Sequence, residues 1–169
     1  MSDTAFNKLM SAANPAMIVV TTVADNEKAG CLVGFHSQSS ISAGHYCLWL
    51  SKANHTYRVA LEATHFGVHF LTTDDLGMAE HFGTLTGENT DKFAGVDVSI
   101  DDTGVPLLGD CPNRMLLERI ALLDDGGDHV CVTARVLWAR AEDPFTPLRT
   151  ADAAHLSPGH ASEERAVEP

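Results

Sequence analysis

Short apolar runs alternate with small polar clusters along the first part of the chain. Three of these runs are rich in β-branched and aromatic residues and are separated by Gly, Asn, Asp and Ser. Runs of this length with turn residues between them are typical of antiparallel strands. We therefore expect strands at Met17–Thr22, Gly30–His36 and His45–Leu50.

Three other segments place apolar residues at helical spacing. Residues 4–13 form the first, and Pro15 ends its pattern. The second, Thr56–Ala63, follows Asn54, whose side-chain oxygen can accept a hydrogen bond from an N–H group at a helix start. The third, Thr73–Gly83, begins with two acidic residues, which the helix dipole favours in a first turn. The spacing predicts three short helices.

The second half of the chain carries the clearest hairpin pattern. Runs Arg114–Leu123 and His129–Arg140 flank the sequence DDGGD at residues 124–128, whose glycines suit a tight turn. Alternating apolar residues also predict a strand at residues 65–71. Residues 83–95 have the composition of a loop.

About six strands joined mostly by turns indicate a mainly β fold. We expect an antiparallel sheet closed into a β-barrel, with short flanking helices. A doubly wound parallel sheet would need a helix between nearly every pair of strands, which the pattern lacks. Residues 1–142 should form one domain, and residues 143–169, which are polar and contain prolines, should form a C-terminal extension or tail. We expect the last ~20 residues to be a loose or partner-draped tail.

Net charge, apolar run length and cysteine content indicate which partners and which cellular location to expect. The 169 residues carry a formal net charge of -12, which argues against nucleic-acid or anionic-membrane partners. No apolar run reaches the ~20 residues of a membrane span, and the N-terminus lacks the pattern of a signal peptide. The four cysteines show no paired short spacing. We expect free thiols rather than a disulfide framework, and a cytoplasmic location.

Several common catalytic motifs are missing from the sequence. The chain has no GxGxxG or GxxxxGK[ST] phosphate-binding motif and no GxSxG nucleophile elbow. His65 and His69 are the best candidate pair of metal ligands, but four residues of extended strand separate their side chains by ~13 Å. We therefore expect neither a metal site nor a serine hydrolase.

Two polar clusters remain as candidate ligand sites. The first follows a predicted strand and consists of Ser37, Gln38, Ser39 and Ser40. Its hydroxyl, amide and backbone N–H groups can bind the edge of a planar heterocycle. The second lies between a strand and a helix and consists of Ser51, Lys52, Asn54, His55 and Thr56. Backbone N–H groups and a lysine at a helix start favour an anion.

Since one predicted strand separates the two clusters, we expect them to lie side by side and to hold a phosphorylated ring compound together. A solvated turn and a simple helix cap are the alternative interpretation. The GDH element at Gly127, Asp128 and His129 is a third candidate. Asp128 could fix the tautomer of His129, whose imidazole would then orient a second ligand at the barrel rim. Gly and Asp are also ordinary turn residues, so the element could simply close a hairpin.

The order of these elements resembles the flavin reductase-like family of FMN-binding split-barrel proteins. The resemblance covers residues 14–140 and is carried by the segments NPAMIVVTT, GCLVGFHSQSSIS, CLWLSKANHTYRVA, FGVHFL, DKFAGV and GDHVCVTARV. It implies a homodimeric antiparallel split barrel that binds FMN or FAD near the subunit interface. It also implies NADH or NADPH as electron donor and, in many cases, delivery of reduced flavin to a partner monooxygenase.

By this resemblance the first cluster would line the flavin ring and ribityl chain, and the second would hold the phosphate. His129, oriented by Asp128, would lie where the nicotinamide stacks. We therefore expect an NAD(P)H:flavin oxidoreductase, a flavin reductase. The family usually has a Pro-Pro pair where this chain has Ala43 and Gly44. This departure favours an alternative, an FMN-binding protein without reductase activity that serves flavin storage, electron relay or sensing. A haem or deazaflavin binder on the same barrel is a third alternative.

Overall fold

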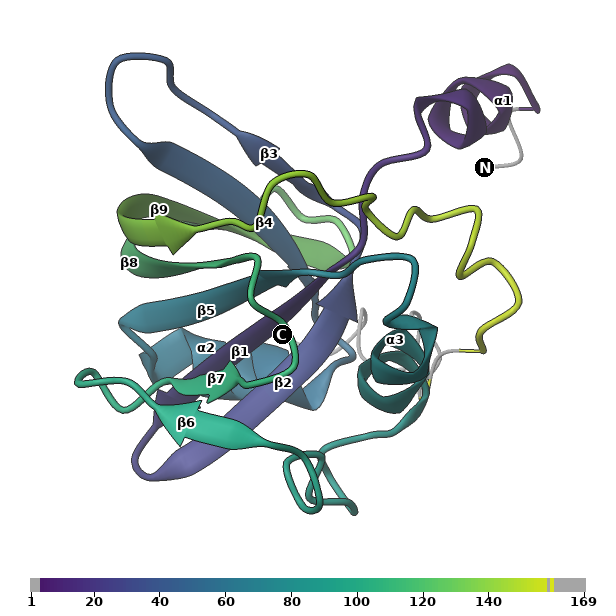
Figure 1. The fold of residues 1–169 in the computed structure, drawn as a ribbon. Coiled ribbons are helices and arrows are strands. Elements are labelled where there is room, and N and C mark those ends of the chain that lie inside the picture. Colours follow the sequence, from purple (N-terminus) through teal and green to yellow (C-terminus); the bar gives the residue numbers. More distant parts are fainter. Residues whose placement is uncertain (1–3, 158, 160–169) are drawn as a thin grey trace.

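The computed structural model describes residues 4–157 and residue 159. Its principal sheet is antiparallel, with seven strands in the order β2-β1-β5-β8-β9-β4-β3 (Figure 1). These strands are β1 (Ile18–Ala24), β2 (Glu27–Val33), β3 (His36–Gln38), β4 (His45–Ser51), β5 (His65–Phe70), β8 (Arg114–Leu123) and β9 (His129–Arg140). A separate hairpin, which the sequence did not indicate, pairs β6 (Val98–Ile100) with β7 (Pro106–Leu108). The expectation of a mainly β, antiparallel fold is confirmed.

The helices of the described residues are α1 (Thr4–Ala13), α2 (His55–Glu62) and α3 (Leu76–Thr84). The bounds of α1 and α2 match the sequence patterns within one residue, and Asn54 caps α2 as expected, with its side-chain oxygen 3.0 Å from the Thr56 nitrogen. The third helix begins later than expected. The Asp75 carboxylate accepts hydrogen bonds from the backbone N–H and the hydroxyl of Thr72, at 2.7 and 2.9 Å. This turn holds Asp75 ahead of the helix instead of in its first turn.

The predicted strand Gly30–His36 is wrong in its extent, because the chain changes partner within it. β2 ends at Val33 and pairs with β1, whereas β3 begins at His36 and pairs with β4. Gly34 and Phe35 link the two, and the Phe35 carbonyl accepts a hydrogen bond from the Trp49 N–H at 2.9 Å. Since β2 and β3 are the two edges of the sheet, this change of partner curls the sheet into a half-barrel (Figure 1).

The hydrophobic core lies inside this curl and also on the outer side of β1. Buried side chains from alternate strand positions fill the inside: Ile18, Val20, Leu48, Leu50, Phe66, Val68, Leu117 and Val132. Val19, which points the other way, belongs to a second cluster with Ala79 and Phe82 of α3. Both faces of β1 are therefore buried, which explains the unbroken apolar run at its start. No helix in the described ranges combines the length and the apolarity that a membrane span requires.

Part of the segment after β9 packs against the body of the protein. Leu148 is 2% exposed and belongs to the second cluster. Its N–H donates to the Leu71 carbonyl at 2.8 Å, and its carbonyl accepts from the Met17 N–H at 2.7 Å. In Figure 1 this segment runs from the end of β9 past β1 to the side of α3. Around Leu148 the C-terminal extension is therefore anchored to the folded body. Residues 158 and 160–169 of the expected tail lie outside the described residues.

Candidate functional site

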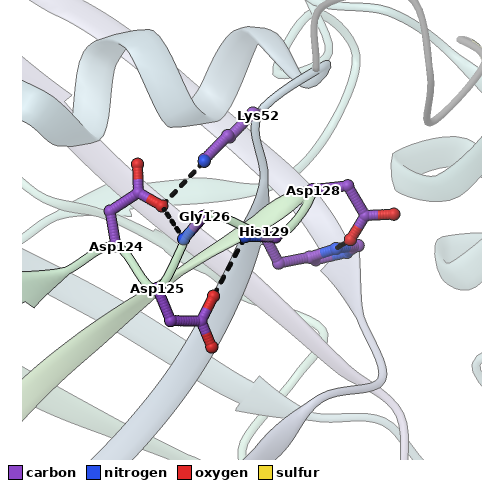
Figure 2. Close-up of polar contacts among 7 residues, drawn as sticks. Lys52, Asp124, Asp125, Gly126, Asp128 and His129 are labelled. Carbon is purple, nitrogen blue, oxygen red and sulfur yellow. Dashed lines mark hydrogen bonds and ion pairs between the residues drawn. The ribbon is translucent and has the colours of Figure 1, made fainter. Parts of the chain in front are cut away.

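The second polar cluster and the GDH element meet at one end of β4 (Figure 2). Ser51, the last residue of β4, is the cross-strand neighbour of His129, the first residue of β9. The Lys52 N–H donates to the Asp128 carbonyl at 2.9 Å. Two segments that are distant in sequence are therefore fixed side by side by backbone pairing.

Lys52 already has a carboxylate partner at this end of the sheet. Its Nζ lies 2.7 Å from Oδ1 of Asp124, and the same oxygen accepts the Gly126 N–H at 2.8 Å (Figure 2). The hydrogen bond from Lys52, followed by that from Gly126, lowers the pKa of the Asp124 carboxyl below its ordinary value. The Lys52 side chain is only 17% exposed, whereas that of Asp124 is 49% exposed. Sequence analysis missed this pair, because 72 residues separate its members.

His129 is held from two sides. Its Nδ1 lies 2.6 Å from the Asp128 carboxylate, so the Nδ1–H donates and Nε2 is left for another partner. The Phe35 ring packs against the imidazole with centroids 5.1 Å apart at a tilt of 57°. The expected contact between Asp128 and His129 is therefore present. Phe35, which is 60% exposed, also belongs to this group. Sequence analysis did not identify it, because it lies near the end of an apolar run and was assigned to a strand.

The first polar cluster lies away from this group. Gln38 pairs with Tyr46 near the start of β4, and five residues of strand separate Tyr46 from Ser51, about 17 Å at the usual rise. The cluster's contacts are local: the Ser37 hydroxyl donates to the Gln38 carbonyl, and the Gln38 amide donates to the Ser40 carbonyl, both at 2.9 Å. The two polar clusters thus occupy opposite ends of β4, and the expectation that they lie side by side is wrong.

Two members of the second cluster, His55 and Thr56, line a cavity of about 620 Å³. The cavity lies between β2, the start of α2 and the loop at residues 87–93, and its lining includes Lys28, His55, Thr56, Gly87, Lys92 and Phe93. Ser51, Lys52 and Asn54 are not among its lining residues. A cavity of this size falls in the range of about 300–1,000 Å³ that is usual for cofactor-sized ligands.

Two side chains of the cavity lining have chemistry that suits a polar ligand. His55 bonds Glu27 through Nε2 at 2.8 Å, while its Nδ1 is buried and has no hydrogen-bond partner among the described residues. Lys92 is 4% exposed, and its Nζ donates to the carbonyls of Gly30 and Phe82 at 2.9 and 3.1 Å. Burial lowers the pKa of the Lys92 ammonium. The His55 Nδ1, unpartnered among the described residues, and the N-terminus of α2 fit a phosphorylated, hydroxyl-bearing ligand such as a flavin nucleotide, whereas the Lys92 ammonium is already bonded to two carbonyls.

Lys92 was not among the candidate residues, although it lies in the DKF segment on which the family resemblance rests. His69, considered above as a metal ligand, has a structural role instead. Its two ring nitrogens bond the Val19 carbonyl at 3.1 Å and the Leu108 N–H at 3.0 Å. No group of three or more His, Cys, Asp or Glu side chains within the described ranges is arranged to hold a metal ion.

Comparison with known proteins gives relatives in both sequence and fold. An FMN reductase (NADH), SmoA, from Agrobacterium fabrum is 29% identical over 139 residues, which cover 82% of this chain and 76% of the relative. The solved NADH:FAD oxidoreductase SgcE6 of Streptomyces globisporus superposes with a TM-score of 0.74 at 20% identity, covering 86% of each chain.

Nitrilotriacetate monooxygenase component B from Mycobacterium thermoresistibile superposes with a TM-score of 0.73 at 20% identity, covering 86% of this chain and 79% of the other. The family model of the flavin reductase like domain matches residues 9–153. That span takes in the half-barrel, the cavity and the packed segment around Leu148. The chain therefore belongs to the flavin reductase-like family.

Proposed function

We propose that this protein is an NAD(P)H:flavin oxidoreductase that transfers hydride from NADH or NADPH to FMN or FAD. The observation that carries the proposal is the match of the flavin reductase like domain to residues 9–153. The relative from Agrobacterium, named an FMN reductase (NADH), supports FMN and NADH as the reactants. The cavity beside the start of α2 supports it independently, because its size and its polar groups fit a flavin nucleotide.

We assign the binding roles to residues as follows. The phosphate end of the flavin would be held by groups at the end of β4 and the start of α2, which are Ser51, Lys52, Asn54, His55 and Thr56. The ring and ribityl chain would contact Ser37, Gln38, Ser39 and Ser40, which requires the flavin to extend along β4. The geometry supports His55 and Thr56 most directly, since both line the cavity.

A bound flavin supplies the hydride acceptor of the reaction, so the protein's own task is to place two flat rings in contact. Asp128 holds the His129 ring through Nδ1–H, which leaves the Nε2 lone pair to accept a hydrogen bond from a second ligand. Phe35 adds an apolar surface beside this imidazole, against which a planar ring can stack. We propose His129, oriented by Asp128, as the nicotinamide-side residue; because it lies opposite Ser51, this role requires the flavin ring to approach the Ser51 end of β4.

The proposed function is tested by mixing the purified protein with FMN or FAD and then adding NADH or NADPH without oxygen. We expect flavin binding, seen as quenched flavin fluorescence, and loss of the yellow flavin absorption after the nucleotide is added. Binding without loss of colour would instead identify a flavin carrier or sensor. Absence of flavin binding would reject both functions.

We also propose three features of the protein's setting. A homodimer is supported by strongly exposed apolar side chains, such as Ile41 at 99% and Leu9 at 65%, which a second copy could cover.

A partner monooxygenase is supported by the structural similarity to a monooxygenase component B. A cytoplasmic location is supported by the four cysteines, all of which are free thiols. Light scattering of the purified protein would test the dimer.

A further inference from the structure

The turn between β8 and β9 places a carboxylate on the lysine that we assign to the flavin phosphate. Asp124 begins this turn and Gly126 adopts a φ of +89°, a conformation that favours glycine. In this conformation the Gly126 N–H and the Lys52 ammonium both donate to the same oxygen of Asp124 (Figure 2). The position of the Asp124 carboxylate is therefore set by the turn's own backbone hydrogen bond as well as by its ion pair with Lys52.

We propose that Asp124 is an internal competitor for the flavin phosphate, and that it sets how strongly the protein prefers phosphorylated over unphosphorylated flavins. This inference rests on the proposed function. A phosphate carries close to two negative charges at neutral pH, as does any phosphate monoester. Arriving beside Lys52, it would meet the Asp124 carboxylate already in place, with Asp125 and Asp128 in the same turn.

Two anions that share one ammonium repel each other, so Lys52 must pass from Asp124 to the phosphate when the flavin binds. The free protein's ion pair is thus given up on binding, and the apparent affinity for a phosphorylated flavin is reduced accordingly. Riboflavin, which has no phosphate, does not need Lys52 and escapes this competition. The ion pair therefore weakens FMN binding selectively.

The chain offers a matched control within the same turn. The Asp125 carboxylate accepts the Gly127 N–H at 3.1 Å, whereas the carboxylate that pairs with Lys52 is that of Asp124. Asp124→Asn and Asp125→Asn remove the same charge from neighbouring positions. In both variants the remaining amide oxygen can still accept the turn's backbone hydrogen bond.

The experiment is a titration of the full-length protein and both variants with FMN and with riboflavin. We expect Asp124→Asn to bind FMN roughly two- to fivefold more tightly, the range expected for loss of one partly exposed ion pair. Riboflavin affinity should stay unchanged, and Asp125→Asn should bind both flavins like the wild type. In a Lys52→Met background, Asp124→Asn should have no effect on FMN affinity, because the ammonium for which the carboxylate and the phosphate compete is then absent.

Three results would overturn the inference while leaving the proposed function intact. FMN affinity that stays the same or falls in Asp124→Asn would mean that Asp124 positions Lys52 for the ligand or plays no part. An equal gain in both variants would mean that only the overall charge matters, and an equal gain for riboflavin would exclude the phosphate. If the wild type binds neither flavin, the proposed function fails, and the inference fails with it.

Discussion

His69 is completely buried, and the backbone uses both of its ring nitrogens. The Nδ1–H donates to the Val19 carbonyl, so Nε2 must carry a lone pair to accept the Leu108 N–H. The ring is therefore neutral in the folded protein. Burial, the leading cause, lowers the pKa of His69 from 6.5 to about 4.

This lowered pKa makes stability depend on pH. Above pH 6.5 the ring is neutral in both states, and its contribution to folding is complete. Between 6.5 and about 4 the unfolded chain binds a proton that the folded protein does not, so stability falls as the pH falls. We expect a loss on the order of 3 kcal/mol from His69 over this window, measured by urea unfolding at several pH values.

A control separates His69 from the other histidines. His69→Gln should lower stability at neutral pH but flatten its dependence on pH, whereas His155→Gln, at an exposed position, should leave the dependence intact. Burial also lowers the pKa of His36, so part of the dependence should persist in the His69 variant. An unchanged slope in His69→Gln would show that this ring does not govern acid sensitivity.

His129 gives a prediction about catalysis. Since Asp128 and Phe35 hold its ring at the rim, we expect His129→Ala to slow flavin reduction by on the order of tenfold or more, through lost orientation of the nicotinamide. Flavin affinity should change by less than about twofold, because among the described residues the His129 side chain bonds Asp128 and none of the residues assigned to the flavin phosphate. Stopped-flow reduction and fluorescence titration measure the two effects. An equal loss of rate and affinity would mark His129 as structural.

Single residues also show how far sequence analysis reaches. Asp128 and His129 are adjacent in sequence, so their contact could be expected from that adjacency. Lys52 and Asp124 meet only because β4 pairs with β9 and the turn after β8 brings the acid back. Such a pair depends on register, which the apolar pattern does not determine to the residue.

At the scale of elements, α2 was predicted well because its start is encoded locally. The Asn54 side chain accepts the Thr56 N–H at 3.0 Å, which satisfies one of the donors left open at a helix start. Asn54→Ala should therefore destabilise the protein by about 1 kcal/mol, measured by urea unfolding. Asn54→Asp should retain the cap and most of the stability. If the alanine variant is as stable as the wild type, the cap contributes nothing to folding.

The path from β2 to β3 was predicted poorly for the opposite reason. Its apolar run continues through Gly34 and Phe35, where the chain leaves β1 and joins β4. A change of partner depends on which strands are adjacent in the sheet, and local propensity does not report that. A separate error placed the polar cluster at Ser37–Ser40 beside Lys52, although segments that precede and follow one strand lie at its opposite ends.

At the scale of the whole molecule, the half-barrel packs against a segment that sequence analysis placed outside the domain of residues 1–142. The residues around Leu148 are polar and include prolines, so composition favours a loose segment. In the structure the segment is instead held in place by Leu148, whose side chain packs in the cluster between β1 and α3. The Leu148 backbone also hydrogen-bonds to Met17 and Leu71. A single buried side chain in a polar context is a weak signal in sequence.

If this segment is part of the folded core, removing the Leu148 side chain should weaken the whole protein. Leu148→Ala leaves a cavity at a position that is 2% exposed, and we expect a loss of about 2–5 kcal/mol in the free energy of unfolding. Leu123→Ala, at a side chain that is 55% exposed, is the matched control and should cost far less. Both are measured by urea denaturation followed by circular dichroism. Equal stabilities in the two variants would mean that the half-barrel folds without this segment, and that the contacts of Leu148 follow from folding instead of supporting it.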